Sequence, residues 1–184
     1  MKEMHRCKWA ENVSNVYKLY HDKEWSVEEH NDSKLFEMLI LESLQAGLSW
    51  QCILNKRENI RKAFANFNAN KIANFTEEDI NKLMNNAAII RNKLKIEAVI
   101  NNSKIFLKIQ KEFNSFDNYI WSFTNREIVY EPYYKRTFSP LSETISKDLK
   151  KRGMKFVGKV IIYSYLQAIG IINGHGEECY KFEK

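Results

Sequence analysis

Two groups of residues in this 184-residue chain could do chemistry, and the first is a set of cysteines and histidines near its two ends. His175 and Cys179 are four residues apart, which places an imidazole and a thiol together as one side of a tetrahedral zinc site would require. Cys7 and His21 could supply the other two ligands, and such a closed site would join the two ends of the chain. The spacing of Cys7 and His21 is not that of a zinc finger, so scattered residues without a metal remain an alternative.

The second group is centred on Glu42, which falls on the apolar face of a predicted helix. The residues on this face follow the three-and-four spacing of a helix: Leu35, Met38, Leu39, Glu42, Gln45 and Ala46. A carboxylate on a face that packs against the core costs free energy unless it is paired, protonated or directed into a polar pocket. Glu42 is therefore either an ordinary solvated glutamate or part of a functional site.

Aromatic side chains that could bind a flat ligand are crowded into the first 30 residues: Trp9, Tyr17, Tyr20 and Trp25. Tyr17 and Tyr20 lie at helical spacing and could share one face with His21. Exposed tryptophans are uncommon, so Trp9 and Trp25 belong either to the core or to the lining of a ligand pocket.

Helices that would position these residues can be located from apolar periodicity and capping residues. One helix is predicted over Asp32–Ala46, where Gly47 ends it and Ser49 caps a second helix that carries Trp50. We also expect two short helices within 59–75, a surface loop at 125–138, and helices near 77–84, 91–112, 116–123, 140–152 and 156–169. Because no repeat or linker interrupts the chain, we predict a single domain over residues 1–184 with two helical lobes.

Composition sets the broad class of the protein. The chain is 44% hydrophobic and 28% charged, with only two prolines and six glycines, which favours a globular fold of helices joined by short loops. A net charge of +6 is compatible with a polyanionic partner. Three cysteines do not indicate a disulfide framework, and we find neither a signal peptide nor an apolar stretch long enough to span a membrane. We therefore expect a cytoplasmic protein without a membrane partner.

A helical hairpin is predicted near residues 77–112. Thr76 and Asp79 form a capping sequence before its first helix, and Arg91, Lys93 and Lys95 lie at the start of its second. In a helix-hairpin-helix element, backbone N–H groups at the start of the second helix bind a DNA phosphate. A plain helical hairpin with a basic, solvated face is the alternative.

Taken together, the motifs resemble the DNA-3-methyladenine glycosylase I family, and they run in order over essentially the whole chain. Two blocks are specific: Leu41-Glu42-x-x-Gln45-Ala46-Gly47-Leu48-Ser49-Trp50 and Lys151-Arg152-Gly153-x-Lys155-Phe156-Val157-Gly158. The other matching motifs are Cys7-Lys8-Trp9, Tyr20-His21-Asp22-x-Glu24-Trp25, Leu35-Phe36-Glu37-Met38, Lys56-Arg57-Glu58-Asn59, Ile89-Ile90-Arg91-Asn92, Lys95-Ile96 and His175-x-x-x-Cys179.

The resemblance implies a monomeric, all-α member of the helix-hairpin-helix glycosylases that removes 3-methyladenine from double-stranded alkylated DNA and leaves an abasic site. It implies one structural zinc ion held by Cys7, His21, His175 and Cys179. It implies a base pocket made of Trp9, Tyr17, Tyr20, Trp25, Glu42 and Trp50. We add Gln45, which follows Glu42 on the same helix face. Among these, Glu42 and Tyr20 are the predicted catalytic residues, and the predicted DNA contacts are Gly47, Leu48, Arg91 and Lys93.

Two departures bear on this expectation, one from the superfamily and one from the family itself. Most members of the superfamily activate water with an aspartate after the hairpin, which this family lacks, and we find no convincing aspartate there. Ala88 and Ser26 both stand where glycine is common in the family. Two alternatives are a catalytically silent protein that binds alkylated DNA on the same fold, and a zinc-stabilised helical protein-interaction domain.

Overall fold

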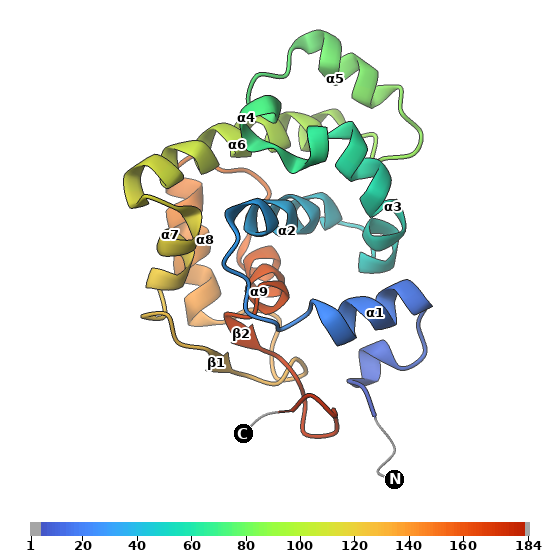
Figure 1. The fold of residues 1–184 in the computed structure, drawn as a ribbon, viewed down its shortest axis with the longest axis vertical. Helices are drawn as coiled ribbons and strands as arrows, with labels where there is room; N and C mark the ends of the chain where they lie inside the picture. The colour runs from blue at the N-terminus through green and yellow to red at the C-terminus, as the bar shows by residue number, and fades with distance from the viewer. Residues whose placement is uncertain (1–4, 183–184) are drawn as a thin grey trace.

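The computed structural model describes residues 5–182 as helices joined by short loops, with one small pair of strands (Figure 1). The helices are α1 (Asn15–Lys23), α2 (Asp32–Gln45), α3 (Trp50–Ala63), α4 (Ala69–Ile72), α5 (Glu77–Met84), α6 (Lys93–Phe113), α7 (Phe116–Ser122), α8 (Pro140–Lys151) and α9 (Lys159–Ala168). Short 3-10 turns cover Lys8–Ala10 and Ala65–Phe67. The expectation of a mostly helical protein is therefore confirmed.

Helix α2 lies at the centre of the molecule, with α3, α6, α7 and α9 packed against it (Figure 1). Every residue from Leu35 to Leu44 is buried, so the helix is enclosed on all sides and does not only present one face to the core. A helix that is apolar all round is typical of such a position. Glu37 and Glu42 are buried within this stretch, and each therefore requires a specific environment.

The helix ends follow the local signals in the sequence. Ser49 accepts a hydrogen bond from the Cys52 amide at the start of α3, and Thr76 forms a reciprocal capping box with Asp79 at the start of α5. Gly47, just past the end of α2, has a φ of +74°, a conformation that glycine adopts without strain.

Helix boundaries differ from the expected ones where a single residue leaves the helical conformation. Helix α9 begins at Lys159 and not at residue 156, because Phe156 has a φ of +55° and Gly158 is the N-cap. In the region 59–75, α3 continues to Ala63, and the chain then passes through a 3-10 turn into α4. The first 30 residues, which look rich in loops, contain the regular helix α1, capped by Ser14.

Two parallel strands, which the sequence did not indicate, join a loop to the C-terminal segment. Strand β1 (Val129–Tyr130) pairs with β2 (Ile172–Asn173), so the predicted surface loop at 125–138 is tied to the molecule at its start. Ser26 supports the C-terminal segment, since its hydroxyl accepts from the Gly174 amide and donates to the Ile172 carbonyl. Ser26 has a φ of +58°, a conformation that glycine adopts without strain and other residues adopt rarely.

The pairing of α5 with α6 places two consecutive helices around the turn at residues 85–92, as expected for a helical hairpin. Two expectations stay predictions: that the chain is a single domain with two lobes, and that residues 77–112 act as a helix-hairpin-helix element. Among the helices of residues 5–182, none combines the length and the apolar character needed to cross a membrane.

Candidate active site and metal centre

A pocket of about 340 Å³ opens where α1, α2, α3 and α9 meet the segment after β1. All seven residues predicted to bind a base line it: Trp9, Tyr17, Tyr20, Trp25, Glu42, Gln45 and Trp50. They come from separate elements that the fold brings together, with Glu42 and Gln45 on the last turns of α2 and Trp50 at the start of α3. A flat ligand that forms hydrogen bonds is bound by aromatic walls around a polar group, and this pocket provides both.

Glu42 is the most unusual group in this pocket. Its side chain is 2% exposed, and its Oε2 atom has no hydrogen-bond partner among the described residues. With no cation to offset the loss of water, burial raises the pKa of Glu42 to about 8. The solvated alternative for Glu42 is therefore wrong, and the unpaired oxygen is available to a ligand.

The aromatic rings around Glu42 contact one another closely enough to form continuous walls. Ring centroids are 4.9 Å apart for Trp9 and Trp25 and 5.3 Å apart for Tyr20 and Trp50. Burial, with a further contribution from the charge of Glu42, raises the pKa of Tyr20 well above its usual value, so its hydroxyl stays protonated. Trp25 is buried in the core and also lines the pocket, so it combines the core position and the pocket position between which the sequence left a choice.

The four cysteine and histidine residues from the two ends of the chain meet in one buried cluster. Their ligand atoms all lie within 4.8 Å of one another. Cys179 Sγ lies 3.5 Å from His21 Nε2 and 3.4 Å from His175 Nδ1, and Cys7 Sγ lies 3.6 Å from His175 Nδ1. In a tetrahedral zinc site with ordinary bond lengths, sulfur and nitrogen ligands are about 3.6 Å apart. The donor set and its spacing therefore fit zinc.

A carboxylate next to this cluster orients one of its histidines. Asp22 Oδ1 lies 2.9 Å from His21 Nδ1, which leaves Nε2 for the cluster. The carboxylate is itself bound by Arg6, whose hydrogen bonds do most to lower the pKa of Asp22. Metal-binding histidines are commonly held in this way by a carboxylate on the second ring nitrogen.

The loop between α2 and α3, where we expect DNA contacts, projects from the molecule beside the pocket. Leu48 is exposed at its tip, and Gly47 has free space around its Cα. Lys95 at the start of α6 donates from Nζ to the carbonyls of Leu44 and Ala46, at 2.8 and 2.6 Å. This contact holds the end of α2, and it spans about fifty residues, so the sequence could not reveal it.

The two other predicted DNA contacts, Arg91 and Lys93, are exposed and lie outside the pocket lining. Lys93 pairs with Glu77 at 2.9 Å, which reduces the charge it offers to a phosphate. The amide of Ala88 donates to Asn86 Oδ1, and the residue has no positive φ. Alanine therefore fits this position without strain, although its N–H group is already used.

The remaining residues of the pocket lining come from α9 and from the segment after β1, and the sequence analysis did not find them: Tyr133, Arg136, Thr137, Val160, Tyr163, Ser164 and Gln167. The four on α9 follow helical spacing, which could have indicated a shared face. This signal is hidden because the helix is apolar nearly throughout, a pattern that is also typical of a core helix.

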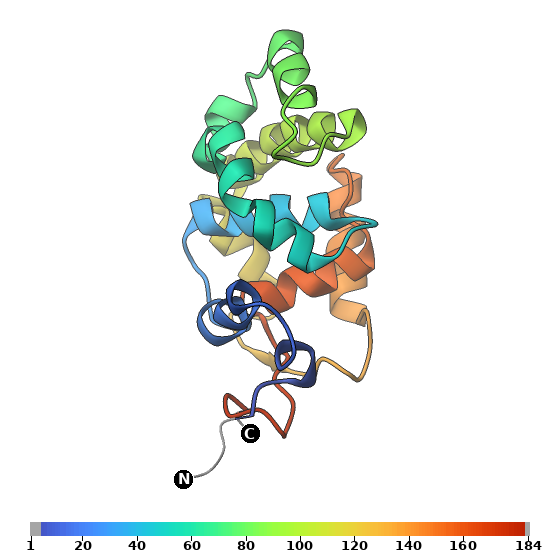
Figure 2. The ribbon, with the colours of Figure 1, turned by 90° about the vertical axis from the view of Figure 1, so that its right-hand side faces the viewer.

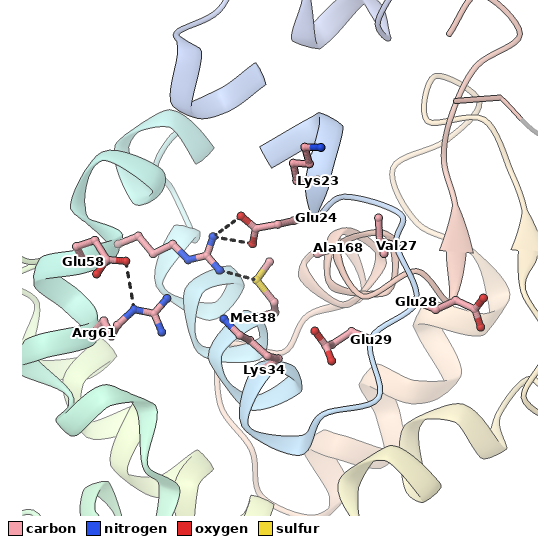
Figure 3. Close-up of a pocket in the computed structure, with 11 residues that line it drawn as sticks. Lys23, Glu24, Val27, Glu28, Glu29, Lys34, Met38, Glu58, Arg61 and Ala168 are labelled. Atoms are coloured by element: carbon pink, nitrogen blue, oxygen red, sulfur yellow. Dashed lines mark hydrogen bonds and ion pairs between the residues drawn. The ribbon is translucent and has the colours of Figure 1, made fainter. Parts of the chain in front are cut away.

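A second hollow, of about 350 Å³, lies between α2, α3 and the segment before α2 (Figure 3). Both of its arginines already form ion pairs, since Arg57 donates to Glu24, and Arg61 pairs with Glu58. Figure 3 shows Glu24 and Glu58 turned toward these guanidinium groups. Without an aromatic ring in its lining, this hollow offers no stacking surface for a base.

Fold and site together define a class: a helical protein with an aromatic pocket around one buried carboxyl group, whose two end segments meet in a cysteine and histidine cluster that could hold a metal. A model of the methyladenine glycosylase family matches residues 9–182. The chain is 42% identical to DNA-3-methyladenine glycosylase 1 of Escherichia coli strain K12 over 184 residues, covering 96% of each chain. It is 40% identical to DNA-3-methyladenine glycosylase of Haemophilus influenzae, over 95% of this chain and 96% of the relative.

Solved structures agree with these relatives. A crystal structure of 3-methyladenine DNA glycosylase I superposes with a TM-score of 0.93 at 41% identity, covering 97% of this chain and all of the other. A second structure, of a point variant of a 3-methyladenine DNA glycosylase I in complex with 3-methyladenine, has a TM-score of 0.93 at 34% identity over 98% of this chain and 99% of the other. The chain belongs to the methyladenine glycosylase family.

Proposed function

We propose that the protein is a DNA-3-methyladenine glycosylase that hydrolyses the bond between a methylated adenine and its deoxyribose in double-stranded alkylated DNA. Support comes first from the pocket, in which a buried carboxyl group with an unpaired oxygen faces a space walled by aromatic rings. Relatives of the same length carry this activity in their names. Because a base inside a duplex cannot reach such a pocket, the lesion must be flipped out of the helix first.

Recognition of the flipped base divides between stacking and hydrogen bonding. Adenine methylated at N3 carries a positive charge while it is attached to the sugar, so the faces of Trp50 and Tyr20 attract it by stacking and cation–π interaction. Glu42 can accept a hydrogen bond from the amino group of the base. The neutral Tyr20 hydroxyl can donate one to a ring nitrogen, while Gln45 lies beside them on α2. We assign Trp9, Tyr17 and Trp25 to the surrounding walls.

Bond cleavage needs little acid catalysis, because the alkylated base leaves as a neutral molecule. A negative charge on Glu42 stabilises the cationic base in the pocket and the positive charge that develops on the sugar. Within the described residues, no aspartate lines the pocket, so we assign no aspartate to the activation of water. Binding and electrostatic complementarity to the transition state supply most of the rate in this proposal.

Cys7, His21, His175 and Cys179 would hold one zinc ion, because their donor atoms and distances fit a closed tetrahedral site. A site in which all four positions are filled by the protein stabilises the fold and takes no part in the reaction. It would hold the N-terminal segment against the C-terminal one, and Trp9 lies two residues from a ligand. A zinc ion bound by these four residues would therefore also support one wall of the base pocket.

Contacts with the rest of the duplex are assigned to the loop at Gly47 and Leu48 and to Arg91 and Lys93. Figure 2 shows the α2–α3 loop and the turn between α8 and α9 on the same side of the molecule. Leu48 at the exposed tip could fill the space that the flipped base leaves in the stack. We further propose that the protein acts as a monomer, and cellular DNA as substrate supports a cytoplasmic location.

The proposal is tested by incubating the protein with methylated duplex DNA and separating the free bases by chromatography. We expect release of 3-methyladenine at a rate above spontaneous depurination. A folded, metal-containing protein that binds the methylated duplex but releases no base would be a silent binder of alkylated DNA, as in the alternative above. Absence of any binding to DNA would favour a protein-interaction domain.

A further inference from the structure

The chain from Tyr133 to Phe138, which we name the basic aromatic segment, borders the base pocket after β1. Its sequence is Tyr-Tyr-Lys-Arg-Thr-Phe. Three of its residues, Tyr133, Arg136 and Thr137, line the base pocket, and all six surround a third hollow directly beside it. The surface is therefore continuous with the pocket that receives the base.

Cations and exposed rings lie together on this surface. Tyr134 and Phe138 are exposed, and Lys159 at the start of α9 lies with Nζ 3.6 Å from the centre of the Phe138 ring. Lys135 is exposed, and the Arg136 side chain is 48% exposed although its Nε pairs with Glu131. Three cations, Lys135, Arg136 and Lys159, thus stand against two carboxylates, Glu131 beside Arg136 and Glu178, which accepts from the Tyr133 hydroxyl at 3.3 Å. Such a surface fits a polyanion with flat rings, which is the chemistry of a nucleic-acid strand.

The backbone of the segment is held in place before any ligand binds. Pairing of β1 with β2 continues as Glu131 N donates to Asn173 O at 3.0 Å and Tyr133 N donates to Gly174 O at 2.8 Å. At its other end, the Ser139 capping box starts α8. Preorganised binding loses less conformational entropy, so a fixed segment can hold a phosphate more tightly than a free loop.

Figure 2 shows the segment on the side of the molecule that also carries the α2–α3 loop. A strand that delivers a nucleotide to the pocket must pass its neighbouring phosphates along this side. We propose that the basic aromatic segment, with Lys159, binds the sugar–phosphate backbone of the lesion-bearing strand next to the flipped nucleotide. This inference rests on the proposed function only in taking DNA as the partner.

The test measures affinity for a duplex that contains an abasic-site analogue, over a series of salt concentrations. This probe has no base to enter the pocket, so it reports backbone contacts. Each lost phosphate contact reduces the slope of log affinity against log salt by about 0.9. We expect the slope to fall by about 1 for Lys135→Ala and by about 2 for Lys135→Ala combined with Arg136→Ala, and to stay unchanged for Arg136→Lys.

Arg126→Ala is the matched control, since Arg126 is 51% exposed and pairs with the carboxylate of Asp117, but it lies outside the pocket lining. Unchanged slopes in the alanine variants, or changes no larger than in this control, would overturn the proposal. The Lys135 side chain has no hydrogen bond or ion pair among the described residues, and its backbone hydrogen bond to the Pro132 carbonyl survives the substitution, so the variant is expected to fold, which melting curves would verify. Release of 3-methyladenine by the wild type is scored separately, so a failure of the glycosylase assignment leaves the slope result interpretable.

Discussion

Glu37 and Glu42 lie five residues apart on α2 and are equally buried, yet only Glu37 is paired with cations. Arg57 Nε lies 2.8 Å from Glu37, and Arg61 binds the same carboxylate at 2.6 Å. Burial by itself would raise the pKa of Glu37, but the two guanidinium groups outweigh it, and the pKa is lowered. Glu42 has no such partner, so burial raises its pKa to about 8. One glutamate belongs to the scaffold, and the other is held ready for a ligand.

The first prediction concerns the pH dependence of base release. A cationic base favours the carboxylate form of Glu42. Because this group is mostly protonated below its pKa of about 8, binding of the base below that pH must release the proton from Glu42. We expect kcat/KM to rise with pH from about 6 to 8, at most tenfold per pH unit, and to level off above the pKa of about 8. Residual activity of Glu42→Gln should lack this rise. A wild-type profile of kcat/KM that is flat from pH 6 to 8 would contradict this role of the Glu42 carboxylate.

The second prediction concerns stability. The pKa of Glu42 in the folded protein lies above its ordinary value of 4.5, so the folded state holds this proton more tightly than the unfolded state. The resulting stability is fully present below pH 4.5 and is lost as the pH rises toward 8. We expect the difference in melting temperature, Glu42→Gln minus wild type, to become more positive as the pH rises from 5 to 8. Glu58→Gln, at a side chain that is 72% exposed, is the control that should show no such trend.

A third prediction tests the scaffold glutamate. Replacing Glu37 with glutamine leaves the largely buried Arg57 without its full counter-charge, which we expect to lower the free energy of unfolding by about 3 kcal/mol. Denaturant titration measures this change. Glu58→Gln removes an exposed partner of Arg61 and should cost less than about 1 kcal/mol. Equal effects of the two substitutions would show that the Glu37 pairs contribute little.

The fourth prediction concerns the metal centre. Cys179→Ser is expected to lower zinc content and to lower the melting temperature by about 10 °C, because metal binding adds directly to folding free energy. Cys52→Ser is the control, since Cys52 lies outside the cluster. Both variants are measured by metal analysis and thermal melting. If Cys179→Ser had the melting temperature of the wild type and kept its metal, the proposed structural role of the cluster would be wrong.

Local signals in the sequence predicted the helix ends well, because a cap involves residues within one turn. Ser49, Thr76 and Ser139 all cap the helices that the sequence predicted. The apolar face of α2 was also visible, but its burial on all sides depends on α3, α6, α7 and α9, which a periodicity of 3.6 residues cannot reveal. The sequence therefore could not separate a solvated Glu42 from a buried one.

Long-range contacts set the limits for the rest of the site. The residue types at both chain ends suggested a zinc site, but only the fold shows that ligand atoms from Cys7 and Cys179 meet. The pocket wall from α9 and the basic aromatic segment were missed, since neither carries a motif and both reach the pocket through tertiary packing. Glu24 and Arg57 lie in motifs of the family resemblance, yet their ion pair was not foreseen.

The most direct test of the central claim is single-turnover release of 3-methyladenine from methylated duplex DNA by wild type, Glu42→Gln and Trp50→Ala. Loss of a charged hydrogen bond or of a stacking ring should slow release by about 30- to 100-fold in each variant. Lys111→Ala, an exposed residue at the end of α6, is the control and should match the wild type. Release by both pocket variants at the wild-type rate would contradict the assignment of this pocket as the site of base excision.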